Sequence, residues 1–236
     1  MRFGRSIIME LFVDIADLDA VKRLAEYFPI EGFTTNPNIL SKASRPVEDM
    51  MEEYRSFVQE QGMKIFFQVT GETADEMIRE AFRLHEFFGE NLVVKLPAVK
   101  EGYKAIAACK KAGLNVCVTV IHSTMQAFMA AKAGADYVAP YVSHIDNLGA
   151  QAVNVIGEML DIMQNYDYPC KILGASFRTV EQIKDLAVIG CDAVTITPDM
   201  FERLIRHPST GESMEMFEYA WTKKFGTKEI TDLLPY

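Results

Sequence analysis

Eight short runs of apolar and β-branched residues recur along the chain, and amphipathic helical patterns lie between them. Strands of a parallel sheet are buried on both faces and read as such runs, whereas the connecting helices bury one stripe. Eight alternating units predict an α/β chain that closes into a (β/α)8 TIM barrel. An open doubly wound sheet is disfavoured, because no G-x-G-x-x-G loop follows the first run. The predicted strands are Met9–Ile15, Gly32–Asn36, Lys64–Thr70, Leu92–Pro97, Asn115–Val120, Asp136–Val142, Lys171–Ser176 and Asp192–Pro198.

The segments between these runs carry the signals of helix ends. Asp17 and Thr73 stand where a helix begins, and each offers a side-chain oxygen to a free backbone N–H. Gly190 follows the last periodic residue of its segment, which is the usual place of a helix C-terminus. These signals predict helices that open at Asp17 and Thr73, and a third helix that begins near Thr179 and ends at Gly190.

With 236 residues, of which 49% are hydrophobic, the chain is large enough for a single domain with a full core. We expect the barrel to occupy residues 9–222. Residues 1–8 are interpreted as an N-terminal extension, because Met9 is an alternative start. Residues 223–236 are interpreted as a tail behind a C-terminal helix, which either frays or packs on a neighbouring subunit.

The formal net charge of −9 and the lack of a Lys or Arg cluster argue against nucleic-acid binding. A small anionic substrate remains compatible, because one or two placed cations override the net charge. The four cysteines are scattered, without a C-x-x-C pair, and are interpreted as reduced core residues. The sequence shows no secretory leader and no run of membrane length, so we predict a cytoplasmic protein without a membrane partner.

Polar side chains end most of the predicted strands. In a barrel the carboxyl ends of the strands face the active site, so these residues are candidates for chemistry. The set comprises Asp14, Thr34, Asn36, Gln68, Lys95, Thr119, Tyr141, Ser176 and Arg178. The sequence therefore predicts one polar site at the mouth of the barrel.

Lys95 is the sharpest of these candidates, because it interrupts an apolar run from Leu92 to Pro97. A buried ammonium is costly unless it is paired or its pKa falls. A lowered pKa supplies the neutral amine that attacks a carbonyl, so burial and catalysis point to the same chemistry. The alternative is a lysine whose amine reaches solvent at the strand end.

Four further strand ends suit a polyol substrate. Asp14 is placed to hold the charge of Lys95 and to accept a proton from a hydroxyl, or else it caps the following helix. Thr34 and Asn36 offer hydrogen bonds at the second strand, although turn chemistry also explains them. Gln68 and Thr119 are expected to share an ordered water.

Ser176 and Arg178 stand before a predicted helix, after the seventh strand, where barrels commonly bind phosphate. A surface arginine is the alternative for Arg178. His144 lies in a predicted loop, where it either touches substrate or is solvated. The four histidines form no metal-ligand set with the acidic residues, and we expect neither a metal nor an organic cofactor.

The strings FVDIADLDAVKRL, GFTTNPNIL, VVKLP, AKAGADYVAPYV and ILGASFRT resemble the short branch of the transaldolase family, which contains fructose-6-phosphate aldolases and small transaldolases. The resemblance extends from Met9 to Trp221. It implies a barrel whose fourth strand carries the Schiff-base lysine, Lys95. It further implies that Asp14 and Asn36 handle the sugar hydroxyls and the lysine, that Thr34 lines the mouth, that Thr119 holds a catalytic water, and that Ser176 and Arg178 bind phosphate.

Two positions divide this branch. Transaldolases have Glu at the position of Gln68 and usually Phe at that of Tyr141, whereas the aldolases pair Gln with Tyr, as here. An amide orients water but transfers no proton, which leaves the phenol as acid and base. The family commonly has Arg where this chain has His144, and this departure weakens the case for a doubly charged phosphate.

The resemblance thus implies a class I aldolase that cleaves a ketose or ketose phosphate, such as fructose 6-phosphate, into dihydroxyacetone and an aldehyde. The first alternative is a transaldolase that transfers the dihydroxyacetone unit between sugar phosphates, or a relative that acts on a sulfonated sugar. The alternative of another class is a non-catalytic sugar-binding barrel. The family also implies a homo-oligomer, a pentamer or a decamer.

Overall fold

The computed structural model describes residues 8–235. The chain divides into two compact units, one that ends at Met200 and one that begins at Phe201. Of the N-terminal extension predicted for residues 1–8, only Ile8 lies within the described residues, and its side chain is exposed.

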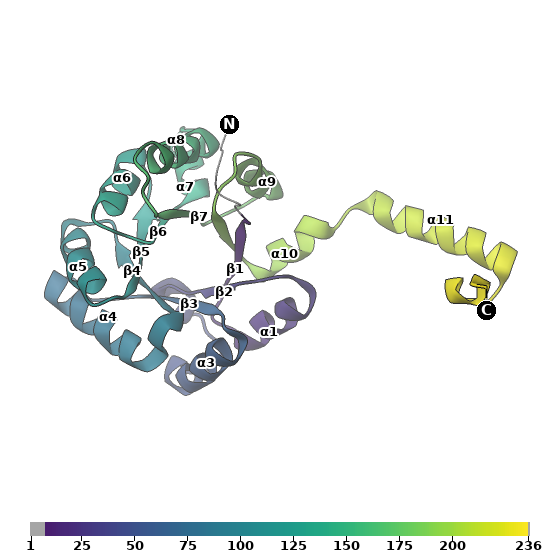
Figure 1. Ribbon diagram of the computed structural model, residues 1–236, viewed down its shortest axis with the longest axis horizontal. Coiled ribbons are helices and arrows are strands. Elements are labelled where there is room, and N and C mark those ends of the chain that lie inside the picture. Colours follow the sequence, from purple (N-terminus) through teal and green to yellow (C-terminus); the bar gives the residue numbers. More distant parts are fainter. Residues whose placement is uncertain (1–7, 236) are drawn as a thin grey trace. The chain divides into compact units, whose positions relative to one another are not determined.

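The first unit contains eight parallel strands that form one closed barrel, in which each strand pairs with the next and the last pairs with the first (Figure 1). The predicted (β/α)8 barrel is confirmed. Each predicted run contains its strand, although β5 continues one residue further than predicted. The strands are β1 (Glu10–Asp14), β2 (Gly32–Thr34), β3 (Lys64–Gln68), β4 (Leu92–Pro97), β5 (Asn115–Ile121), β6 (Tyr137–Pro140), β7 (Lys171–Gly174) and β8 (Ala193–Ile196).

Helices surround the ring of strands and cover its outer face (Figure 1). They are α1 (Leu18–Tyr27), α2 (Pro37–Leu40), α3 (Val47–Gln61), α4 (Ala74–Phe88), α5 (Lys100–Lys111), α6 (Thr124–Lys132), α7 (Val142–Asn147), α8 (Ala152–Asn165) and α9 (Val180–Val188), and α10 (Pro198–Ile205) crosses the boundary between the units. A 3-10 turn, η1 (Gly89–Asn91), precedes β4.

The predicted helix caps are confirmed. The Asp17 carboxylate accepts hydrogen bonds from the N–H groups of Asp19, at 2.9 Å, and Ala20, at 3.3 Å. Thr73 and Thr179 each form a capping box, in which the cap and the third helical residue bond reciprocally. Side-chain oxygens thus satisfy N–H groups that the helix leaves free.

The barrel interior is filled by an apolar layer, because alternate side chains of every strand point inward. The Phe66 ring lies edge-on to the rings of Phe12 and Tyr137, with centroids 5.0 and 5.3 Å apart. Gly32 contributes no side chain here: its φ is +149° and a Cβ would lie 1.9 Å from the Lys64 carbonyl oxygen. The layer consists of Phe12, Phe66, Val93, Cys117, Tyr137, Ala139, Leu173 and Ala193, each at most 4% exposed.

An ionic cluster closes the barrel at the amino ends of the strands. Lys171 and Lys64 donate to one oxygen of the Glu10 carboxylate, at 2.8 and 3.0 Å, and the Tyr137 hydroxyl donates to the other at 2.8 Å. Burial opposes ionisation of Glu10, but these three hydrogen bonds outweigh it and lower its pKa. Glu10 is therefore held as a carboxylate beneath the apolar layer.

The second unit holds the long helix α11 (Pro208–Phe225) and the short 3-10 helix η2 (Ile230–Leu233). The helix continues past the predicted limit of residue 222. The Trp221 indole N–H donates to the Lys228 carbonyl oxygen at 2.7 Å, and its ring lies 4.6 Å from that of Phe225. No helix among residues 8–235 is both long and apolar enough to cross a membrane.

Replacing Glu10 by Gln removes the charge that organises the ionic cluster. We expect Glu10→Gln to lower the free energy of unfolding near neutral pH by about 1–2 kcal/mol, because the cluster loses its charge-assisted hydrogen bonds while its lysines stay partly solvated. Because folding lowers the pKa of Glu10, its stabilisation is present above the pKa of the unfolded chain and disappears as pH falls through the folded value. Urea unfolding at several pH values measures both effects.

The matched control is Glu26→Gln, which changes an exposed carboxylate on α1. Equal loss of stability in the two variants, or a Glu10→Gln effect that persists in acid, would contradict this account of the cluster.

Candidate active site

The carboxyl ends of the strands bring a second polar group together, above the apolar layer. Inward-facing side chains follow the same alternation that fills the barrel below them, so the last inward residue of each strand lies at the mouth. The residues at these positions are Asp14 on β1, Thr34 on β2, Gln68 on β3, Lys95 on β4, Thr119 on β5, Tyr141 directly after β6 and Thr195 on β8.

Lys95 lies inside the barrel with only 5% of its surface exposed. Its ammonium group donates to the Thr35 carbonyl oxygen at 2.8 Å. Burial lowers the pKa of Lys95, and the nearby Asp14 charge opposes that shift only in part. The alternative of a lysine that reaches solvent is therefore wrong, and the amine is poised to lose its proton.

The end of β4 is fixed by the close approach of α5. A Cβ on Gly102 would lie 2.0 Å from the Pro97 carbonyl oxygen, so that only glycine allows the first turn of α5 to pack there. Lys95 is two residues before Pro97 on this strand. The helix thus limits movement of the segment that carries the amine.

Asp14 is partly buried at the end of β1, and the cap of α1 is Asp17 rather than Asp14. The Thr34 hydroxyl donates to the Asp14 carboxylate at 2.6 Å. Burial raises the pKa of Asp14, against the opposing effects of the Lys95 charge and the Thr34 hydrogen bond. A raised pKa makes this carboxylate a stronger base towards a substrate hydroxyl.

Thr195 adds a member that the sequence interpretation missed. Its hydroxyl lies 2.6 Å from that of Thr34, and its side chain is buried on β8. Because Thr34 has one hydroxyl proton and gives it to Asp14, Thr195 is the donor to Thr34. The alternation of Ala193 and Thr195 along β8 was the signal available in the sequence, because both are inward-facing positions.

Thr119 and Tyr141 form a second pair across the mouth, with 3.3 Å between their hydroxyl oxygens. Burial raises the pKa of Tyr141, so the phenol keeps its proton and is available as a proton donor. Gln68 pairs in register with Lys95 and is half-buried. It also borders an outer groove between α3 and α4.

Asn36 has a structural task. Its side-chain oxygen accepts from the Ile39 N–H at 3.0 Å and caps α2, as turn chemistry alone would predict. The side-chain NH2 group remains as a donor beside the mouth.

Ser176 and Arg178 lie between β7 and α9. Ser176 has a φ of +60° and its hydroxyl lies 3.2 Å from that of Ser143. Arg178 is exposed, and its backbone N–H donates to the Gln182 side chain in the first turn of α9 at 2.8 Å. The two residues therefore stand together at a helix N-terminus, which suits an anion.

His144 lies on α7, so its placement in a loop is wrong. Its ring is 5.3 Å from that of Tyr141 and stacks on His122 at 5.7 Å. His122, which the sequence interpretation left out of the site, also contacts Tyr141, at 5.5 Å. Three rings thus gather at the edge of the mouth.

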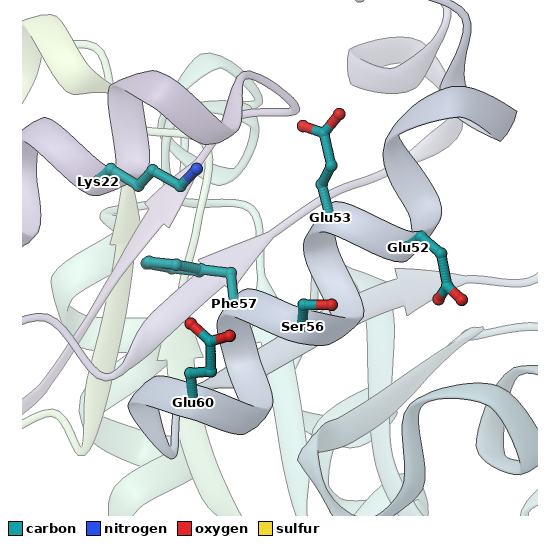
Figure 2. A pocket seen from close by; sticks show the side chains of 6 residues that line it. All are labelled: Lys22, Glu52, Glu53, Ser56, Phe57 and Glu60. Carbon is teal, nitrogen blue, oxygen red and sulfur yellow. The ribbon is translucent and has the colours of Figure 1, made fainter.

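Among residues 8–235 no three His, Cys, Asp or Glu side chains form a group that could hold a metal ion. Figure 2 shows another hollow, outside the barrel, where Lys22 faces Phe57 and Glu60. Lys22 is exposed there, with its amine 5.9 Å from the centre of the Phe57 ring, so that it lacks the burial that distinguishes Lys95.

Comparison with solved structures identifies the fold. The chain superposes on a mutant mandelate oxidase that holds a monooxide FMN adduct with a TM-score of 0.55 and 18% identity, over 84% of this chain and 67% of that one. It superposes on native KDPGal with a TM-score of 0.54 and 13% identity, over 83% and 84% of the two chains. At such identities the likeness extends to the barrel alone.

Comparison with sequences goes further. A probable transaldolase from Chelativorans sp. (strain BNC1) is 36% identical over 215 residues, which span 91% of this chain and 97% of the relative. The family model described as transaldolase/fructose-6-phosphate aldolase matches residues 11–233. With a buried lysine on the fourth strand of a closed barrel and matches over nearly its full length, the chain belongs to the transaldolase/fructose-6-phosphate aldolase family.

Proposed function

We propose that this protein is a class I aldolase, in which Lys95 forms a Schiff base with a ketose and cleaves it to dihydroxyacetone and an aldehyde. The observation that carries the proposal is the Lys95 amine, buried inside the barrel with its pKa lowered by burial. A neutral amine attacks a carbonyl, and the resulting iminium accepts the electrons of the carbon–carbon bond that breaks. Fructose 6-phosphate fits the family and the anion-binding character of the Ser176 and Arg178 segment.

The neighbouring groups supply the proton transfers. Neutral Lys95 adds to the carbonyl and the carbinolamine loses water to give the iminium. Asp14, with its raised pKa, takes the proton from the hydroxyl whose carbon becomes the aldehyde. After the aldehyde has departed, the dihydroxyacetone unit remains on Lys95 as an enamine. Tyr141, through a water held by Thr119 and Gln68, protonates that enamine, and hydrolysis of the new iminium releases dihydroxyacetone.

The second candidate is a transaldolase, in which an acceptor aldehyde captures the enamine before it is protonated. The name of the Chelativorans relative favours it. Gln68 and Tyr141 favour the aldolase, because an amide cannot transfer a proton and the phenol beside Thr119 can. A non-catalytic sugar-binding barrel is the third candidate, and it provides no reason to bury an amine.

Reductive trapping tests the Schiff base. Borohydride added with dihydroxyacetone should leave a stable adduct on Lys95, located by peptide mass mapping, because reduction converts the iminium to a secondary amine. Lys95→Met should abolish both the adduct and turnover. The control Lys100→Met changes an exposed lysine five residues away and should retain both. A catalytically active Lys95→Met, or an adduct elsewhere, would sink the Schiff-base proposal.

Incubation with the donor alone separates the two enzyme candidates. Purified protein given fructose 6-phosphate without an acceptor should release free dihydroxyacetone continuously, because Tyr141 protonates the enamine. An enzymatic assay of dihydroxyacetone measures the release. No release of dihydroxyacetone, with one equivalent of glyceraldehyde 3-phosphate per site and turnover only after an acceptor aldehyde is added, would identify a transaldolase instead.

The charge of Asp14 should set the pH at which Lys95 reacts. Asp14 raises the pKa of Lys95 against the effect of burial, so Asp14→Asn is expected to move the titration of the amine to lower pH. Turnover should fall about 100-fold in the same variant, because the general base is lost. The pH dependence of the initial rate of reductive trapping measures the amine directly.

Asp19→Asn serves as the control, since Asp19 is an exposed carboxylate of α1. A trapping profile of Asp14→Asn that moves to higher pH, or does not move at all, would show that Asp14 does not act on Lys95 electrostatically.

A further inference from the structure

The strand that carries Thr119 contains a bulge. Val118 pairs with Val138 and Ile121 with Pro140, so that three steps along β5 match two along β6. Val120 occupies the left-handed region with a φ of +62°, which is unusual for a β-branched residue. The structure therefore holds one extra residue here, immediately after Thr119.

The bulge changes which side chains face the barrel interior. Side chains alternate along a strand, so a residue three positions after Thr119 would normally point outward. One extra residue reverses the alternation, and Ile121 lies buried in register with Pro140. His122 is thereby directed to the mouth, where its ring meets those of Tyr141 and His144.

The two imidazoles are held by their ring faces and edges, and their nitrogens stay available. His122 and His144 stack with 25° between their planes, and the Tyr141 ring stands nearly perpendicular to both. Within residues 8–235 the only hydrogen bond through the side chain or N–H of His122 is from its backbone N–H to Gln126. Among residues 8–235, the ring nitrogens of His122 and His144 have no hydrogen-bond partner.

The charged groups nearest to His122 and His144 are bonded to other protein groups. Asp146, on the same helix as His144, is already engaged by the Gln182 amide and the Ala152 N–H. Asp14 lies in the barrel, bonded to Thr34, and Lys95 is bonded to the Thr35 carbonyl. Arg178, after β7, is a cation at the same end of the barrel.

We propose that the bulge at Val120 turns His122 into the mouth so that His122 and His144 together bind the anionic end of the substrate. This inference rests on the proposed function, because it assigns the specificity of the same site. An imidazole N–H donates a hydrogen bond to a phosphate or similar anion, and two such donors at one edge of the mouth bind the same anion together. The site thereby selects for an anionic ketose or aldehyde.

Kinetics with matched substrates test the assignment. The preference for fructose 6-phosphate over fructose, expressed as the ratio of kcat/KM values, should fall about tenfold in His122→Asn and in His144→Asn, the effect of one charge-assisted hydrogen bond. His144→Arg should keep the preference, because a guanidinium also binds an anion. His207→Asn, an exposed histidine of the second unit, is the control. Equal losses on both substrates, or an unchanged ratio, would overturn the proposal.

Changes at Val120 test the role of the bulge. Val120→Gly should keep the preference, because glycine adopts a positive φ without strain. Deletion of Val120 restores the normal alternation and should match His122→Asn. A deletion variant that folds and keeps the preference would show that the bulge does not place His122. If the deletion variant does not fold, the His122→Asn ratio decides the outcome.

Direct binding separates failure of this inference from failure of the proposed function. The NMR signals of the His122 and His144 ring protons should shift together when sulfate is added, because both rings contact the same anion. Absence of such a shift, or a shift of one ring alone, would overturn the histidine site. Absence of a dihydroxyacetone adduct on Lys95 would overturn the proposed chemistry without affecting this measurement.

Discussion

The burial of the Lys95 amine is the constraint on which the rest of the site depends. An ammonium inside a barrel loses its hydration. The protein replaces the lost water only with one carbonyl oxygen and a nearby carboxylate. The folded state therefore lowers the pKa of Lys95 and makes loss of its proton easier than in the unfolded chain. Stability and reactivity are linked at this position, since the same desolvation that destabilises the charged form supplies the nucleophile.

The barrel separates this reactive amine from the charges at its other end. From bottom to top the interior consists of the ionic cluster around Glu10, the apolar layer around Phe66, and the polar mouth. The cluster groups two lysines with a carboxylate and stays fully paired, whereas the mouth holds one lysine without a direct carboxylate contact. Both ends thus contain lysines, but only the lysine above the apolar layer combines near-complete burial with a lowered pKa.

Much of this arrangement follows from local rules and is therefore visible in the sequence. Strand positions, the Asp17 and Thr73 caps and the interruption of an apolar run by Lys95 each depend on neighbours within a few residues. Thr195 is less visible, because a threonine suits a strand for ordinary reasons and its partner Thr34 is 161 residues away. His122 was missed because an extra residue reverses the strand alternation, and that reversal is a property of the pairing between β5 and β6. The capping role of Asn36 was open in the sequence, since turn and site chemistry use the same side chain.

The three-member chain from Thr195 through Thr34 to Asp14 has a direction, because each hydroxyl owns a single proton. Once Asp14 gains a proton from substrate, its oxygen becomes a donor and both threonine hydroxyls can rotate to point the other way. No heavy atom has to move. Protonation of the carboxyl group thus reverses the direction of the hydrogen bonds that join the three side chains. The network is satisfied with Asp14 either ionised or protonated.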